Sequence, residues 1–293
     1  MSENAEEMQT DTGWTVLTGS TGGLGAEIVA QLAARGRAMV WINRSAAKAE
    51  AQRTRLLAQH PELKVELVAA NLMDTGQIAT AAAAIDSIPG RIDALYNNSG
   101  VLTAEKVLSA QGVESQFAVN TLAPYQLLRA LQGRMARPAA DPPAMVVNLS
   151  SSVIQRLKTL DVGELADPPR VGGLMSTYAQ TKLAVTALAP ALADELKADN
   201  ILIRAIDPGA TKTAMTTGGS SGMPRLLSWL APLLFRPADE QAAKLVESAD
   251  PAAHESRTGV FVGNRRVRKM PRPAADPAVQ TELVALLDGL LSR

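Results

Sequence analysis

Short apolar segments alternate with longer amphipathic segments along almost the whole chain. These segments are nearly all apolar, a pattern typical of strands that are buried on both faces of a sheet. Strands that alternate with helices favour a parallel sheet with helices on both faces. We therefore expect a single α/β domain with a doubly wound parallel sheet of the Rossmann type. The predicted strands are Trp14–Leu17, Ala38–Ile42, Leu63–Val68, Ile92–Tyr96, Ala144–Leu149, Ile201–Ile206 and Gly259–Val262.

The segments between these strands predict helices. The first begins after a glycine-rich turn and ends near Arg35, because Gly36 is a natural residue at a helix C-terminus. The segment Val113–Met135 is long enough for one helix or two. The remaining predicted helices are 45–59, 77–88, 177–196, 240–248 and 279–291.

The two least regular segments are the N-terminus and residues 214–236. Residues 1–11 are polar and acidic and predict a disordered tail, so that residues 12–293 form the domain. Segment 214–236 contains the flexible stretch Gly218–Gly222 followed by apolar residues, which predicts a lid over a substrate pocket. A core helix explains the same apolar residues equally well, and a peripheral membrane contact is a third interpretation.

The composition excludes several classes of function. Hydrophobic residues make up 46% and charged residues 20%, and the formal net charge is zero, so charge gives no basis for nucleic-acid binding. The absence of cysteine excludes a disulfide, a thiol nucleophile and a cysteine-based metal site. The two histidines, His60 and His254, form no ligand motif, and we expect no metal. No apolar run approaches the ~20 residues of a membrane span, so we expect no integral membrane segment and a cytoplasmic protein.

The glycine-rich turn Thr18–Gly25 lies between the first strand and the first helix. Glycine permits positive φ and lets the backbone approach a ligand closely. The helix that follows points its free N–H groups and the positive end of its dipole toward an anion. A glycine-rich turn alone is a weak signal, but this position is the one expected of a phosphate site.

Ligands of such sheets bind outside the carboxyl ends of the strands, and the second strand ends in Asn43-Arg44-Ser45. NAD sites usually have an acidic residue here to bind the ribose 2′-hydroxyl, and this chain has none. Arg44 instead offers a guanidinium suited to a 2′-phosphate, and Ser45 can add a hydrogen bond. The pattern favours NADP(H) over NAD, the plain alternative being that Arg44 is an ordinary surface residue.

Tyr178 and Lys182 are four residues apart on a predicted helix and so share one face. A tyrosine has an ordinary pKa near ~10, and a nearby ammonium favours the phenolate. We therefore expect Lys182 to lower the pKa of Tyr178, whose hydroxyl could then exchange a proton with a carbonyl oxygen.

Several fragments occur together in an order that resembles the short-chain dehydrogenase/reductase family. They are the glycine turn, Asn97–Gly100 with Ser99 where the family usually has alanine, Asn148–Ser151, Tyr178–Lys182 and Asp207–Thr213. The resemblance covers about residues 12 to 270. Arg44 and the long segment between Ser151 and Tyr178 are similar to the retinol-dehydrogenase-like branch, although this does not name the substrate.

The resemblance implies roles for particular residues. The implied catalytic residues are Asn120, Ser151, Tyr178 and Lys182, in which Ser151 stabilises the substrate oxygen and Asn120 holds a water that joins the lysine to a proton relay. The third strand ends in Asn71-Leu72-Met73-Asp74, and the adenine contact could come from Asn71 or Asp74. The implied cofactor-binding residues are Gly19, Ser20, Thr21, Gly23, Leu24, Gly25, Asn43, Arg44, Ser45, Asn71, Leu72, Asn98, Gly100, Tyr178, Lys182, Pro208, Gly209, Thr211 and Thr213.

Together these features predict an NADP(H)-dependent oxidoreductase that transfers a hydride between nicotinamide and a carbonyl or alcohol carbon. The lid interpretation implies an apolar substrate. The alternative is a non-catalytic nucleotide-binding sensor or scaffold of the same fold. The resemblance also implies a homodimer or homotetramer paired through about 122–135 and 177–196. A basic cluster after the last strand is expected to be a solvated edge; it comprises Arg265, Arg266, Arg268, Lys269 and Arg272.

Overall fold

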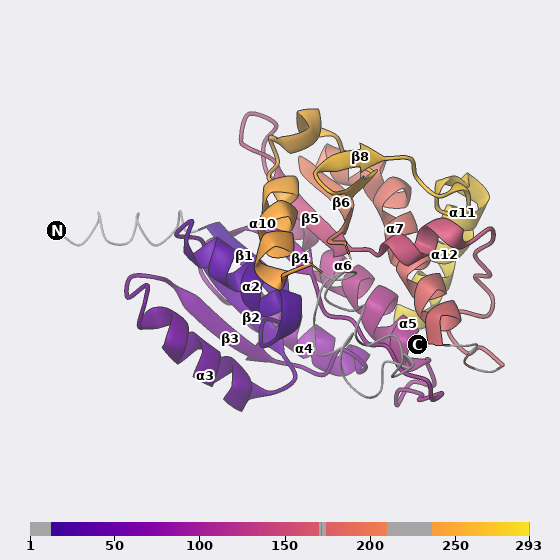
Figure 1. Cartoon of the computed structure of the whole chain (residues 1–293), viewed down its shortest axis with the longest axis horizontal. Coiled ribbons are helices and arrows are strands. Elements are labelled where there is room, and N and C mark those ends of the chain that lie inside the picture. The colour runs from indigo at the N-terminus through magenta and orange to yellow at the C-terminus, as the bar shows by residue number, and fades with distance from the viewer. Residues whose placement is uncertain (1–12, 170, 172–173, 210–235, 293) are drawn as a thin grey trace.

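An eight-stranded sheet runs through the centre of the molecule (Figure 1), in the order β3-β2-β1-β4-β5-β6-β7-β8. The computed structural model describes residues 13–169, 171, 174–209 and 236–292. The first seven strands are parallel, and β8 pairs antiparallel with β7. The strands are β1 Gly13–Thr18, β2 Ala38–Asn43, β3 Val65–Ala69, β4 Arg91–Asn97, β5 Ala144–Leu149, β6 Ile201–Asp207, β7 Val260–Gly263 and β8 Arg266–Arg268.

The seven predicted strands are confirmed, and so is the doubly wound parallel sheet. The eighth strand, β8, was not predicted, because Arg266-Val267-Arg268 is short, charged and part of the basic cluster. Its pairing with β7, which itself pairs with β6, brings Arg268 back toward Asp207 at the end of β6, which matters for the site described below.

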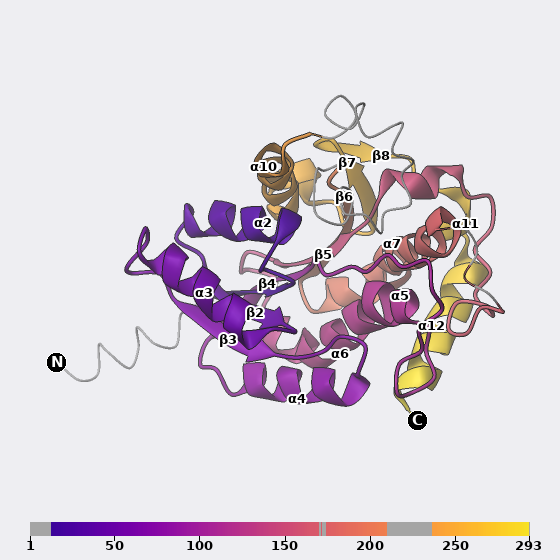
Figure 2. The same ribbon diagram turned by 60° about the horizontal axis from the view of Figure 1, so that its bottom comes forward.

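Helices cover both faces of the sheet (Figure 2), and the core is accordingly divided in two. One face packs against α2, α3 and α10, and the other against α4, α6 and α7. The long helices are α2 Gly23–Ala33, α3 Ala46–Leu57, α4 Thr75–Asp86, α6 Ala123–Met135, α7 Leu174–Ala198, α10 Ala238–Ala249 and α12 Pro277–Leu291. Strand β5 is buried at every position because it lies between the two cores.

The predicted segment Val113–Met135 begins with short helix α5, Ser115–Phe117, passes through the π-helical turn η1, Ala118–Leu122, and continues directly into α6. Glu114 caps its start, where its carboxylate accepts hydrogen bonds from the backbone N–H groups of Gln116 and Phe117 at 2.8 and 3.0 Å. A single π turn inside a helix often marks a functional position. Here the turn contains Asn120.

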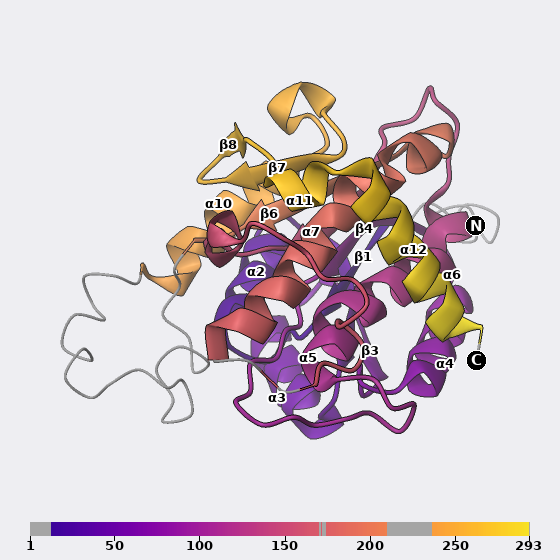
Figure 3. The ribbon, with the colours of Figure 1, turned by 90° about the vertical axis from the view of Figure 1, so that its right-hand side faces the viewer.

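The C-terminal helices lie across the outer side of the α6 and α7 layer (Figure 3). Short helix α11, Arg272–Ala275, and α12 both pack on α7, and the Tyr125 hydroxyl on α6 bonds the Asp288 carboxylate on α12 at 2.5 Å. As a result, the middle of α7 is buried on all sides within one chain.

The predicted disordered tail lies outside the described residues, and so does segment 214–236 except for Arg236. The disorder of the tail and the lid therefore remain predictions. Within the described ranges, no helix combines the length and the apolar character needed to cross a membrane.

Candidate active site

In the glycine turn after β1, three glycines cannot be replaced without backbone strain or a collision. Gly19 has φ +72° and Gly23 has φ +55°, values that favour glycine. A Cβ on Gly25 would lie 2.0 Å from the carbonyl oxygen of Gly19. No side chain caps the N-terminus of α2, so the N–H groups of its first turn are open to a ligand. A backbone cradle of this form fits the diphosphate of a dinucleotide.

Hydrogen bonds between this turn and the residues that follow the neighbouring strand β4 fix its shape. Asn98 donates through its side-chain amide to the carbonyl oxygens of Thr18 and Gly19, at 2.9 and 3.0 Å. The Thr18 hydroxyl oxygen accepts from the backbone N–H groups of Asn98 and Ser99, at 3.0 and 2.9 Å. Asn98 was predicted as a cofactor contact, and the structure places its amide on the turn itself.

At the end of β2, Asn43 forms a buried hydrogen-bonded pair, whereas the next residue, Arg44, is an exposed charge. Ser20 and Asn43 are both buried and bond to each other twice, from the Ser20 N–H to Asn43 Oδ1 at 3.0 Å and from Asn43 Nδ2 to the Ser20 hydroxyl at 2.9 Å. Arg44 is exposed and has no hydrogen bond or ion pair among the described residues. Ser45 begins α3, where its hydroxyl accepts from the Lys48 N–H at 3.4 Å.

At the end of β3 the two candidate adenine contacts have different surroundings. The Asp74 carboxylate caps α4, accepting from the N–H groups of Gly76 and Gln77 at 2.9 and 3.1 Å, and these bonds lower its pKa. Asn71 uses only its side-chain oxygen, which accepts from the Met73 N–H at 3.2 Å. Since Asp74 is committed to the helix, the geometry favours Asn71. Leu72 between them is buried.

Tyr178 and Lys182 lie on one face of α7, with the lysine Nζ 5.9 Å from the centroid of the tyrosine ring. Lys182 is buried and donates to the carbonyl oxygen of Leu149, at the end of β5, at 2.9 Å. Gly100 lies against it, because a Cβ there would be 3.5 Å from Lys182 Nζ and 3.4 Å from Asn120 Oδ1. The end of β4, the π turn and α7 therefore meet at one point.

Asn120 is fixed in the π turn by three hydrogen bonds. Its side-chain oxygen accepts from the Val101 N–H at 2.8 Å, and its amide donates to the Val101 carbonyl and to the Thr181 hydroxyl, each at 3.0 Å. The Thr181 hydroxyl in turn donates to the carbonyl oxygen of Tyr178 at 2.9 Å. Thr181 links Asn120 to the helix that contains Tyr178, a connection that could not be predicted from sequence.

The two serines at the end of β5 are not equivalent. Ser150 is buried, and its hydroxyl lies 2.7 Å from the Thr186 hydroxyl on α7. Ser151 is half-buried and begins the short helix η2, Ser152–Arg156, where its hydroxyl oxygen accepts only a long bond of 3.5 Å from the Val153 N–H. Ser151 is thus the serine whose hydroxyl remains able to donate to a substrate, as the resemblance implies.

The pKa values differ from the expectation for the tyrosine. Burial, assisted by the nearby Asp207 carboxylate, raises the pKa of Tyr178 to about 12. Burial lowers the pKa of Lys182 to about 8. The expected lowering of the tyrosine pKa is therefore wrong, because desolvation of the phenolate dominates and the Asp207 carboxylate acts in the same direction. At neutral pH Tyr178 carries its proton and can donate it.

Asp207, at the end of β6, is a residue whose importance the sequence did not reveal. Its carboxylate accepts from the Gly209 N–H at 2.9 Å, where Gly209 has φ +82°, and burial raises its pKa. A carboxylate at the carboxyl end of a strand was the available signal. Of the predicted residues in this motif, Pro208 and Gly209 close β6, whereas Thr211 and Thr213 lie outside the described residues.

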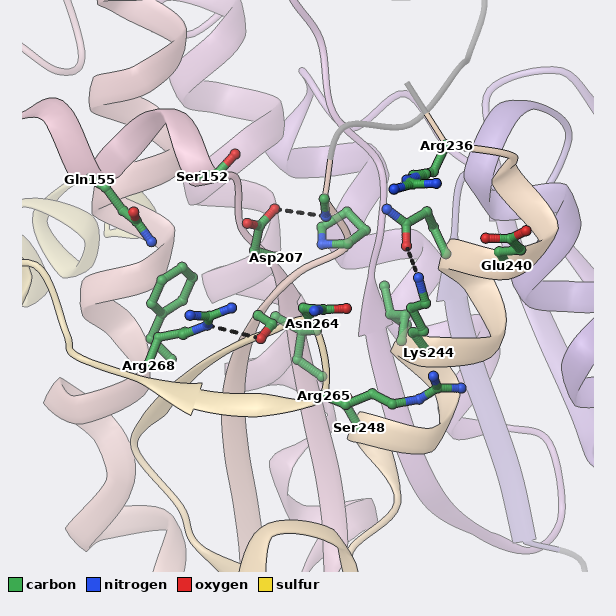
Figure 4. A pocket seen from close by; sticks show the side chains of 17 residues that line it. Ser152, Gln155, Asp207, Arg236, Glu240, Lys244, Ser248, Asn264, Arg265 and Arg268 are labelled. Atoms are coloured by element: carbon green, nitrogen blue, oxygen red, sulfur yellow. Dashed lines mark hydrogen bonds between the residues drawn. The ribbon is translucent and has the colours of Figure 1, made fainter. Parts of the chain in front are cut away.

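Beyond Asp207 lies a cavity of about 680 Å³ between the ends of β6 and β7, strand β8 and helix α10 (Figure 4). Arg265 and Arg268 from the basic cluster line it, so the cluster is not only a solvated edge. Lys244 of α10 and Arg236 add two further cations. Ser152, the residue next to Ser151, forms part of the same wall.

Comparison with known proteins agrees with this geometry. A family model described as short chain dehydrogenase matches residues 13–160 and 170–223. Retinol dehydrogenase 12 of Bos taurus is 30% identical over 200 residues, which are 68% of this chain and 62% of that protein. The chain thus aligns with about three fifths of the length of such curated relatives.

Solved structures share the fold. An uncharacterised protein from Mycobacterium paratuberculosis superposes with a TM-score of 0.73 at 22% identity, covering 97% of this chain and 95% of that one. A blue fluorescent protein from a metagenomic library, in complex with NADPH, gives 0.66 at 24% identity and covers 87% and 97%. The sheet, the glycine turn and the matched residues agree, and the chain belongs to the short-chain dehydrogenase family of oxidoreductases, in its retinol-dehydrogenase-like branch.

Proposed function

We propose that the chain is an NADP(H)-dependent oxidoreductase that interconverts a carbonyl compound and an alcohol. The observation that carries the proposal is the meeting of Tyr178, Lys182 and Asn120 at the carboxyl end of the sheet, beside a turn in which Gly25 leaves no room for a side chain. Such a turn fits a dinucleotide, and the three side chains fit proton transfer next to it.

Bound in this cradle, the nicotinamide would supply or accept the hydride. The chain's own residues would handle the proton. Tyr178, protonated at neutral pH because its pKa is raised to about 12, would donate its proton to the carbonyl oxygen in the reductive direction. Ser151 would donate a hydrogen bond to the same oxygen and orient the carbonyl. Asn120, held by Val101 and Thr181, would support the lysine side of the proton relay.

Arg44 supports NADP(H) as the cofactor. It is an exposed cation at the end of β2 without a partner among the described residues, and no acidic side chain stands at that strand end. A guanidinium binds a phosphate through parallel hydrogen bonds, which suits the 2′-phosphate. A related fold binds NADPH in the metagenomic fluorescent protein.

The body of the substrate and the assembly of the protein remain open to test. An apolar substrate body depends on segment 214–236, most of which is outside the described residues. The predicted homo-oligomer would pair through α6 and α7. Because α12 already covers part of these two helices, a second copy would contact exposed positions of α6 such as Ala130 and Gly133. Light scattering at micromolar concentration should then give a multiple of 30.8 kDa, and the monomer mass would refute the pairing. The cytoplasmic location stays a prediction.

A non-catalytic nucleotide sensor of the same fold is the second candidate. It predicts NADPH binding with no turnover. The complete set of Asn120, Ser151, Tyr178 and Lys182 favours the enzyme, because a sensor has no use for a protonated tyrosine beside a buried lysine.

The test follows NADPH consumption at its near-ultraviolet absorbance across a panel of aldehydes and ketones. The proposal expects turnover of at least one of them. A protein that binds NADPH tightly and reduces no member of a broad panel would favour the sensor and contradict the enzyme.

A further inference from the structure

The cavity beyond Asp207 differs from the rest of the site in its charge. Among the described residues, its lining contains four cationic side chains, Arg236, Lys244, Arg265 and Arg268, against two acidic ones, Asp207 and Glu240. Most of the other lining residues are polar or are glycines, and Figure 4 shows Arg236, Lys244 and Arg268 entering from different elements around the same space. A cavity with this wall suits an anion better than an apolar group.

These cations differ in how many of their hydrogen-bond donors are already used within the protein. Arg265 pairs with Glu247 on α10 and is thereby occupied. Arg268 donates through its Nε to the carbonyl oxygen of Gly263 at 3.1 Å, which fixes the guanidinium and leaves its terminal Nη groups without a hydrogen bond among the described residues. Lys244 donates one bond to Gln241 at 3.3 Å, out of three that an ammonium can make. Arg268 and Lys244 therefore keep donors available.

The acidic residues do not cancel this charge. Asp207 is itself satisfied by backbone N–H groups, those of Gly209 and Ser152, and Arg268 is a neighbouring charge that lowers its pKa against the effect of burial. Glu240 is exposed on the first turn of α10. No ion pair joins either acid to Arg268 or Lys244 among the described residues, so the two cations can act on a ligand.

The cavity also lies next to the proposed catalytic residues. Ser152 lines it and directly follows Ser151 in the chain. Asp207 lines it as well, and its charge is close enough to act on Tyr178. A molecule whose carbonyl carbon lay at Ser151 and Tyr178 could therefore extend into the cavity.

We propose that this cavity binds an anionic group, a carboxylate or a phosphate, carried by the substrate at a distance from its reacting carbonyl, with Arg268 and Lys244 as the recognising cations. The proposal rests on the oxidoreductase function proposed above and narrows its substrate class to acidic carbonyl or hydroxy compounds. An apolar body between the two ends remains compatible with it, because only the terminal group would meet the cations.

The test compares each acidic substrate with its neutral methyl ester, using para-formylbenzoate and an ω-oxo fatty acid. The ratio of kcat/KM for acid over ester should be ~10-fold or more in the wild type, since a charge-assisted hydrogen bond contributes at least that factor. Arg268→Met and Lys244→Met should each lower the ratio by about tenfold. Arg266→Met is the matched control, because Arg266 is an exposed arginine on the same strand that does not line the cavity, and it should keep the ratio.

A binding measurement separates this inference from the enzyme function. Inorganic phosphate should raise the Tm of the wild type and of Arg44→Ala, and raise it less in Arg268→Met and Lys244→Met. If no carbonyl is reduced but this pattern holds, the oxidoreductase proposal fails and the anion site stands. If turnover occurs but acid and ester react equally, or if Arg266→Met changes the ratio as much as Arg268→Met, the anion site is wrong.

Discussion

The two halves of the sheet's carboxyl edge use polar side chains in opposite ways. Around the glycine turn, Thr18, Asn43 and Asn98 bond to backbone groups or to Ser20. Around the cavity at β6, β8 and α10, Arg268 and Lys244 keep donors directed at open space. In the first half, polar side chains build a backbone shape that recognises a ligand; in the second, charged side chains would recognise it directly.

This difference predicts how each half responds to substitution. A change in the glycine-turn half alters the shape of the backbone and should affect folding and cofactor binding together. A change in the cavity half removes a charge at a surface that the fold does not depend on, so it should alter selectivity. Tyr178 stands between the halves, where Asp207 acts on it from the cavity side and Lys182 from the cofactor side.

The largest effect is expected at this junction. Tyr178→Phe removes the proton donor and keeps the ring, and general acid–base catalysis contributes ~10²–10⁴-fold. Turnover with NADPH should fall by about that factor while the Kd for NADPH stays nearly the same. Steady-state rates and NADPH fluorescence titration measure the two quantities, and full activity in the variant would exclude the tyrosine mechanism.

Arg44 is a cation without a partner among the described residues, in the half where the other polar groups are paired. It therefore tests whether recognition by charge also operates there. A charge-assisted bond to the 2′-phosphate contributes ~1.5–3 kcal/mol, which is about ten- to a hundredfold in affinity. Arg44→Ala should weaken NADPH binding by this factor and leave NADH binding almost unchanged. Equal weakening of both cofactors, or a wild type that binds NADH as tightly as NADPH, would contradict the assignment.

A substitution at Gly25 tests whether the backbone shape of the glycine turn recognises the cofactor. A Cβ on Gly25 would lie 2.0 Å from the Gly19 carbonyl, a backbone atom that cannot move without opening the turn. Overpacking of this kind costs ~1–3 kcal/mol, so Gly25→Ala should lower both the free energy of unfolding and the affinity for NADPH.

Gly133→Ala is the matched control, because nothing lies within 4 Å of a Cβ on this exposed helical glycine. It should stabilise the protein slightly, since alanine is favoured over glycine in a helix by ~1 kcal/mol. Denaturant unfolding measures both variants. A Gly25→Ala protein as stable as Gly133→Ala, with unchanged NADPH affinity, would show that the turn tolerates a side chain.

The smallest expected effect is a pH dependence of cofactor binding. Burial lowers the pKa of Lys182 to about 8, so its ammonium form dominates below that pH and is lost above it. If the ammonium binds the nicotinamide ribose, as in the family, NADPH affinity should weaken as pH rises through about 8. Tyr178, whose pKa is about 12, does not titrate in that range. Fluorescence titrations on either side of pH 8 should show the loss of NADPH affinity in the wild type and no such loss in Lys182→Met. The same pH dependence in both proteins would mean that another group causes it.

The residues that could be predicted from sequence are those whose signal is local. Buried strands such as Ala144–Leu149, the spacing of Gly19, Gly23 and Gly25, and the four-residue interval between Tyr178 and Lys182 are all visible in short windows. The doubly wound parallel sheet could be predicted because parallel strands separated by helices have few possible arrangements.

The remaining features depend on contacts between distant segments. The bond between Asn43 and Ser20 could not be predicted, because it joins the end of β2 to the turn after β1. The raised pKa of Tyr178 depends on burial and on Asp207, neither of which a helical spacing reveals. The cavity depends on β8 bringing Arg268 back toward the end of β6, and a segment of three residues, two of them arginines, gives no sign of a strand in the sequence.

The most direct test of the central claim follows the hydride itself. The purified protein is incubated with NADPH that carries deuterium at both positions of the reactive nicotinamide carbon and with an acidic aldehyde such as para-formylbenzoate, and the alcohol is examined by mass spectrometry. The account predicts one deuterium on the new carbinol carbon, formed by the wild type and not by Tyr178→Phe above background. An alcohol without deuterium, or no alcohol from any aldehyde or ketone while NADPH remains bound, would contradict it.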